Sequence, residues 1–117
     1  MKILYLNCSM GAAGDMLSAA LLELHPNPQD FLRRLNEALP DRVVVTAEPD
    51  EKGGFRGTHF RVRVDGEEEG QPSHGGHPPH TSLSEIREQI AGMRIPELVR
   101  TDVLSVYDRI ADRKSVG

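Results

Sequence analysis

The chain has 117 residues, the length of one ordinary domain, and domains of this size can build one modest core. Fourteen Lys and Arg against eighteen Asp and Glu leave a formal net charge of −4, so nucleic acid is excluded as an expected partner. No apolar run approaches the ~20 residues that span a bilayer, and no secretory leader is expected at the start. The single cysteine, Cys8, cannot form an intrachain disulfide, which fits a cytoplasmic location.

The first predicted elements are one strand and two helices. Residues Lys2–Leu6 have the pattern of a short strand, and small residues at 7–14 form a turn after it. A helix rich in Leu and Ala is predicted over Asp15–Leu24. A second helix is predicted over Pro28–Leu39, because Asn27 is a favoured cap and proline is tolerated in the first turn.

The later elements are predicted to be a hairpin and two more helices. Apolar and polar residues alternate over Val43–Ala47 and again over Phe60–Val64, on either side of a turn at Lys52–Gly54. A helix over Ser82–Met93 opens with a capping box, and apolar residues at helical spacing predict another over 96–110. The resulting order, βααββαα, predicts a single α+β domain over 1–117 in which helices cover one face of a small sheet.

The middle of the chain changes character. Residues Asp65–His80 contain no aliphatic or aromatic side chain, so they cannot contribute to a core. We therefore expect a flexible loop rich in Gly, Pro and His over 65–81, inside the single domain.

Three of the five histidines lie in this segment, at His74, His77 and His80. Neutral imidazole suits nickel, copper and zinc, and the acidic run Glu67–Glu69 adds charge that attracts a dication. The two glycines after His74 permit a bend, whereas the two prolines before His80 resist one, so two histidines can meet more easily than three. Binding should weaken as the pH falls through ~6.5, where imidazole gains a proton. The alternative is a solvated linker that holds no metal.

The turn after the first strand holds a second group of candidates. A strand, a small-residue turn and a helix start direct backbone N–H groups at an anion, and Gly11 and Gly14 would let a cofactor approach closely. Asp15 is either a metal ligand or general base, or simply a cap of the helix. Cys8 is either a nucleophile or soft ligand beside these amides, or a small buried apolar residue.

This order of motifs resembles the N-terminal part of the LarC-type nickel insertion proteins, over nearly the whole chain. The resemblance rests on the opening motif at Asn7–Met16, on Gly54–Thr58 and on the histidine segment. In the opening motif, Asn7 and Met10 stand where the family has Asp and Ser. The matching positions are Cys8, Gly11, Gly14, Asp15 and Met16.

The resemblance implies a lyase-type cyclometallase that makes the nickel pincer nucleotide cofactor of lactate racemase. Such an enzyme inserts nickel into pyridinium-3,5-bisthiocarboxylic acid mononucleotide, with CTP and a divalent cation. Family members continue into a C-terminal component. This chain is therefore expected to capture or deliver nickel, and to be inactive when isolated. Its expected partners are the C-terminal component and the apoprotein of lactate racemase. The alternative is a non-catalytic metal-binding or interaction module that docks on the C-terminal partner.

Overall fold

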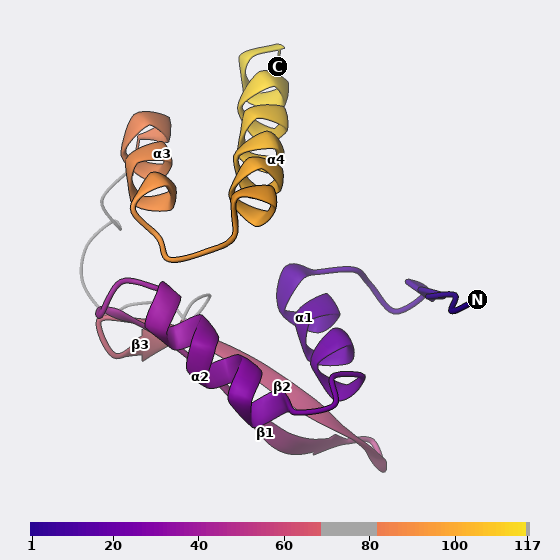
Figure 1. The fold of residues 1–117 in the computed structure, drawn as a ribbon. Helices are drawn as coiled ribbons and strands as arrows, with labels where there is room; N and C mark the ends of the chain where they lie inside the picture. Colours follow the sequence, from indigo (N-terminus) through magenta and orange to yellow (C-terminus); the bar gives the residue numbers. More distant parts are fainter. Residues whose placement is uncertain (69–81, 117) are drawn as a thin grey trace. The chain divides into compact units, whose positions relative to one another are not determined.

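The computed structural model describes residues 1–68 and 82–116, which form four helices and a three-stranded antiparallel sheet (Figure 1). The predicted α+β class is confirmed, and the observed order of elements is ααβββαα. The chain divides into two compact units. We call Met1–Asn36 with Asp41–Gln71 the hairpin unit, and Glu37–Pro40 with Pro72–Gly117 the helical unit.

The hairpin unit is built on two long strands, β1 over Val43–Lys52 and β2 over Phe55–Val64. Gly53 and Gly54 join them with φ of 58° and 82°, the left-handed conformation that a two-residue hairpin turn favours. The register confirms the predicted alternation, because the apolar residues of the two strands lie opposite one another. The apolar pairs are Val43 with Val64, Val45 with Val62, and Ala47 with Phe60.

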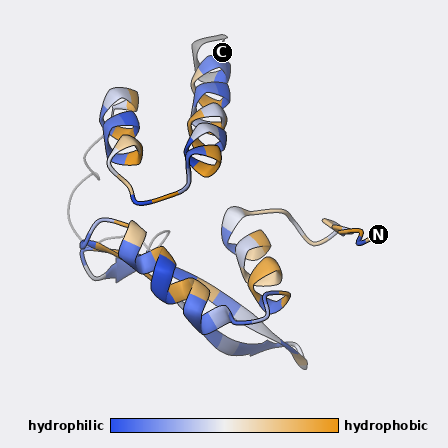
Figure 2. Ribbon diagram, in the orientation of Figure 1, coloured by the Kyte–Doolittle hydropathy of each residue, from blue (hydrophilic) through white to orange (hydrophobic). Residues whose placement is uncertain are grey.

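Two helices complete this unit. Helix α1 spans Gly14–Glu23 and packs beside β2 (Figure 1). Helix α2 spans Pro28–Ala38, and its residues up to Asn36 belong to this unit. The predicted cap of α2 is confirmed, since the Asn27 side chain accepts a hydrogen bond from the Asp30 amide at 3.2 Å. In Figure 2 apolar colour dominates much of α1, whereas polar and apolar residues alternate along α2. The buried side chains of the unit are Ala19, Leu22, Leu32 and Val45.

Asn36 ties α2 to the outer edge of β1. Its side-chain oxygen accepts from the Val45 amide at 2.8 Å, and its side-chain nitrogen donates to the Val45 carbonyl at 2.9 Å. The same nitrogen also donates to the Leu32 carbonyl at 3.0 Å. One amide side chain thus satisfies both polar backbone groups of a buried edge residue, as a neighbouring strand would.

The strand predicted over Lys2–Leu6 is wrong. This segment forms no strand, and the side chains of Ile3 and Tyr5 are 80% and 84% exposed. A strand exists through hydrogen bonds to a neighbour, and no part of 1–68 or 82–116 supplies that neighbour. A short apolar run indicates that a segment can pair but cannot provide its partner, so the first element of the predicted order is missing.

The predicted loop over 65–81 also needs a correction at its start. Asp65 and Gly66 form a tight turn with φ of 54° and 84°, and the chain returns as β3, Glu67–Glu68, paired with the end of β2. The Asp65 amide donates to the Arg42 carbonyl at 2.8 Å, which anchors the turn. A two-residue turn of this kind places the next residues in register for pairing, whatever their hydropathy. The rest of the predicted loop, 69–81, lies outside the described residues.

The helical unit contains α3, Leu83–Ala91, and α4, Glu97–Val116, packed side by side (Figure 1). The capping box is confirmed: the Glu85 amide donates to Ser82 Oγ at 3.2 Å and the Ser82 amide donates to Glu85 Oε2 at 3.1 Å. Among the helices described, none is at once long and apolar enough to cross a membrane.

Candidate functional site

The turn before α1 is compact and exposed. The Gly11 amide donates to the Cys8 carbonyl at 3.1 Å, and the Ser9 amide donates to Asn7 Oδ1 at 3.1 Å. Gly11 has a φ of 117°, and a Cβ atom there would lie 3.4 Å from Cε of Met16, so glycine suits this position in both conformation and space. Cys8 is exposed, so the alternative of a buried apolar cysteine is wrong. The thiol is open to solvent beside the turn.

Asp15 lies in the first turn of α1 and does not cap it. The N-cap is Ala13, which has no side-chain hydrogen bond to offer, and Asp15 Oδ1 accepts from the Met16 amide at 2.9 Å. The alternative that Asp15 is the N-cap residue of α1 is therefore wrong. A carboxylate is still well placed in the first turn, because the positive end of the helix dipole lies there.

Two cavities are lined by both Asp15 and His59. The first has a volume of about 290 Å³ and is bordered by Asp50, Lys52 and Arg56 as well. The second has a volume of about 340 Å³ and includes Gly14, Arg61 and Glu68. Of the residues proposed from the sequence, Gly14 and Asp15 therefore lie at the cavities, next to a histidine that comes from β2.

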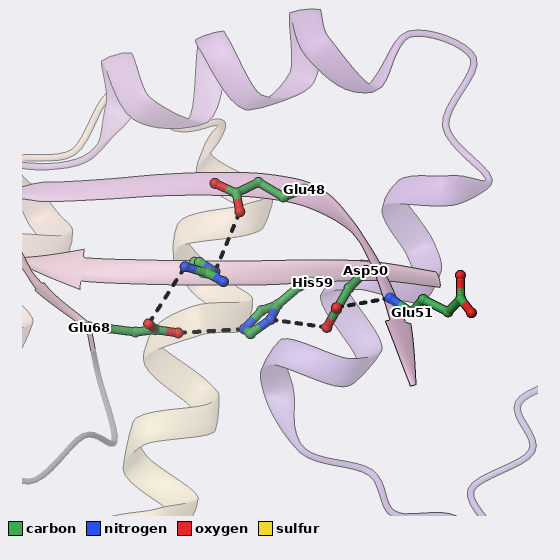
Figure 3. A network of polar contacts seen from close by, with 6 residues as sticks. Glu48, Asp50, Glu51, His59 and Glu68 are labelled. Carbon is green, nitrogen blue, oxygen red and sulfur yellow. Dashed lines mark hydrogen bonds and ion pairs between the residues drawn. The ribbon is translucent and has the colours of Figure 1, made fainter. Parts of the chain in front are cut away.

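His59 stands between two carboxylates on the polar face of the sheet (Figure 3). Its Nδ1 is 3.6 Å from Asp50 Oδ2, and its Nε2 is 3.5 Å from Glu68 Oε1. Both distances exceed those of ordinary hydrogen bonds, so these are electrostatic contacts that strengthen when the ring carries a proton. The imidazole side chain is 31% exposed and the Glu68 side chain 22%, so solvent screens the pairs only in part.

Arg61 extends this arrangement along β2. Its Nη1 is 3.9 Å from Glu68 Oε2, and its Nε is 3.8 Å from Glu48 Oε2. Nε is buried and makes no hydrogen bond within the described parts of the chain. Acidic and basic side chains thus alternate across the sheet, from Glu48 through Arg61, Glu68 and His59 to Asp50. We call these five residues the polar network.

The polar network follows from the strand register. Residues two apart share a face, so His59 and Arg61 lie on the side opposite Phe60 and Val62. Glu48 lies directly across from His59. His59 lies outside both the opening motif and the histidine segment, so neither motif selects it. The sequence signal that could have found the polar network is the pairing of acidic residues on β1 with basic residues on β2.

The described residues hold no group of three or more His, Cys, Asp and Glu side chains arranged to bind a metal ion. The two carboxylates contact different nitrogens of His59, so they do not converge with the ring on one point. The proposed metal ligands His74, His77 and His80 lie in 69–81, outside the described residues, and their role stays a prediction.

Comparison with known proteins gives a family match over most of the chain. A family model described as "Nickel insertion protein" matches residues 4–116. No solved structure is significantly similar to the chain.

Curated proteins of the same description are similar to it at low identity. A putative nickel insertion protein of Geotalea daltonii is 31% identical over 98% of this chain and 27% of its own length. The pyridinium-3,5-bisthiocarboxylic acid mononucleotide nickel insertion protein of Akkermansia muciniphila is 28% identical over 98% of this chain and 28% of its own length. The chain thus spans little more than a quarter of the length of these relatives.

Proposed function

This chain belongs to the nickel insertion protein family, and we propose that it captures nickel for insertion into pyridinium-3,5-bisthiocarboxylic acid mononucleotide. Nickel is a substrate in this reaction. The chain corresponds to the N-terminal part of the family, and a C-terminal component would complete the CTP-dependent step that yields the cofactor of lactate racemase. The isolated chain would bind nickel without turning over the mononucleotide.

The observation that carries the proposal is the location of Asp15. This residue belongs to the opening motif on which the family resemblance rests, and it lines both cavities together with His59. A carboxylate in a cavity that an imidazole also lines can accept a proton or hold a dication, and a site that inserts a metal needs both abilities. Asp15 is proposed as the base or nickel ligand, and Cys8 as the thiolate donor in the turn before it.

Capture of nickel is assigned to His74, His77 and His80, which are neutral and able to coordinate above the pKa of imidazole. Gly11 and Gly14 are assigned to the approach of the mononucleotide, whose phosphate would find backbone amides at the start of α1. The assignment of Gly11 and Gly14 is supported by the geometry of the helix start. Ala13 is the N-cap of α1 and makes no side-chain hydrogen bond, so not all backbone N–H groups of the first turn have a partner within the helix.

A protein of family length tests the proposal. In it, this chain replaces the matched N-terminal part of the Akkermansia muciniphila relative, and nickel incorporation into the mononucleotide is followed with CTP present. Replacing His74, His77 and His80 by Ala should slow incorporation when nickel is scarce and have little effect when nickel is in excess. Asp15→Asn should slow incorporation at every nickel concentration. His25→Ala, a histidine outside both the segment and the cavities, is the control.

The second candidate function is a non-catalytic interaction module. It is favoured by one observation, the exposure of several apolar side chains on α4, which a partner could cover. A module would hold the complex together, so the Asp15 and histidine variants would all incorporate nickel at the rate of the unaltered protein. That result would reject the nickel-capture proposal.

A further inference from the structure

Helix α4 contacts α3 within the helical unit. Arg100 Nε donates to the Ile90 carbonyl at 3.2 Å, and Arg87 of α3 pairs with Asp108. Val103 and Leu104 are partly buried on this side. These contacts define which side of α4 is occupied within the helical unit.

An exposed apolar stripe runs along α4 beside Val103, at the border of the side that contacts α3. Val99, Val106 and Ile110 follow one another at i, i+7 and i+11, a spacing that returns to within roughly 20° of the same direction on a helix. Their side chains are 44%, 55% and 48% exposed. Asp108 points roughly 180° away from the stripe, at ~100° per residue. We call these three residues the α4 seam.

We propose that the α4 seam is the surface on which the remainder of a nickel insertion protein docks. The choice of partner rests on the family assignment made above, and the proposal goes beyond it by naming the surface. The family match runs to residue 116 and so includes all of the seam. In the relatives, the matched region is the N-terminal part, and close to three quarters of their length lies outside it.

The chemistry of the seam defines what can cover it. Aliphatic side chains at this spacing fit an amphipathic helix or another apolar face of similar length. Asp102, Arg109 and Arg113 flank the seam on one side, by the same helical spacing. The docking face should therefore have an apolar centre and a charged rim with both signs, which is the usual composition of a specific interface.

The experiment compares melting temperatures of the family-length protein described above and of this chain alone. Val106→Asp should lower the melting temperature of the family-length protein by several degrees, because a charge buried in an apolar interface is costly. The same change should leave this chain alone unaffected, since Val106 is exposed there. Ser105→Asp, one residue away and off the seam, is the matched control for charge. Val106→Ser is a milder second variant, which should give a smaller shift of the same sign.

Several results would overturn the proposal. If Val106→Asp leaves the melting temperature of the family-length protein unchanged, no partner covers the seam. If it lowers the melting temperature of this chain alone by the same amount, the chain itself covers the seam. Self-association of this chain that Val106→Asp abolishes would assign the seam to a second copy. Failure of the family-length protein to fold, when the parent relative folds, would show that this chain does not present the surface the remainder needs. Nickel incorporation is a separate readout, so loss of nickel capture with docking intact would reject only the proposed function.

Discussion

The two faces of the β1–β2 hairpin are built from alternate residues of the same strands but are packed differently. One face carries Val45 and its apolar neighbours, and Val45 is 4% exposed. The other carries the polar network, whose ion pairs are 3.5–3.9 Å long and open to solvent in part. Burial of apolar surface stabilises strongly, whereas partly exposed ion pairs contribute little. The first face therefore maintains the fold, and the second leaves ionisable groups accessible for chemistry.

The largest expected effect comes from the apolar side. Leu32 is 6% exposed, so Leu32→Ala should lower the free energy of unfolding by about 3 kcal/mol through lost burial and a residual cavity. Urea unfolding measures this. Leu24→Ala, at a side chain that is 70% exposed, is the control and should cost much less. Similar losses for both variants would contradict a core at this place.

A smaller loss of folding stability is expected at the link between α2 and β1. Asn36→Ala removes the partner of both polar backbone groups of Val45, which should cost about 2 kcal/mol. Asn7→Ala removes a single hydrogen bond in an exposed turn and serves as the control. If the two variants unfold at the same urea concentration, Asn36 does not act as the edge partner of β1.

The polar network should tolerate substitution. His59→Gln removes two long contacts with carboxylates, and we expect at most about 1 kcal/mol of lost stability. His25→Gln is the matched control. A loss for His59→Gln as large as that of Leu32→Ala would break the comparison, because the polar face would then be a structural element in its own right.

The smallest effect concerns Asp30, on the exposed side of α2. The hydrogen bond from Arg33, at 2.7 Å, lowers the pKa of Asp30 below its usual 3.8. A carboxyl whose pKa is lower in the folded state adds stability above about pH 3.8 and loses it as the pH falls through the folded value. Carboxyl titration by NMR should give a midpoint below 3.8 in the native chain, and Arg33→Gln should raise it. An unchanged midpoint in that variant would exclude Arg33 as the cause.

Most of the fold could be predicted because its signals are local. The hairpin, the cap at Asn27 and the capping box at Ser82 each depend on a few adjacent residues, and all were confirmed. The strand at Lys2–Leu6 failed because pairing needs a distant partner that no local pattern reports. Strand β3 was missed because the turn at Asp65–Gly66, not hydropathy, determines it.

The sequence motif identified two of the residues that line the cavities. Gly14 and Asp15 were proposed from the motif, and the structure brings them to cavities lined by His59. His59 and its carboxylate neighbours were missed, because their proximity depends on strand register and on the packing of α1 beside β2.

The proposed capture of nickel through His74, His77 and His80 is tested most directly by calorimetric titration with Ni²⁺. The native chain should release binding heat at pH 7.5, with affinity that falls as the pH drops through ~6.5. Replacing the three histidines by Ala should lower the affinity by about tenfold or more, whereas His25→Ala should leave it nearly unchanged. Absence of binding heat in the native chain, or equal affinity in the triple variant, would contradict the claim.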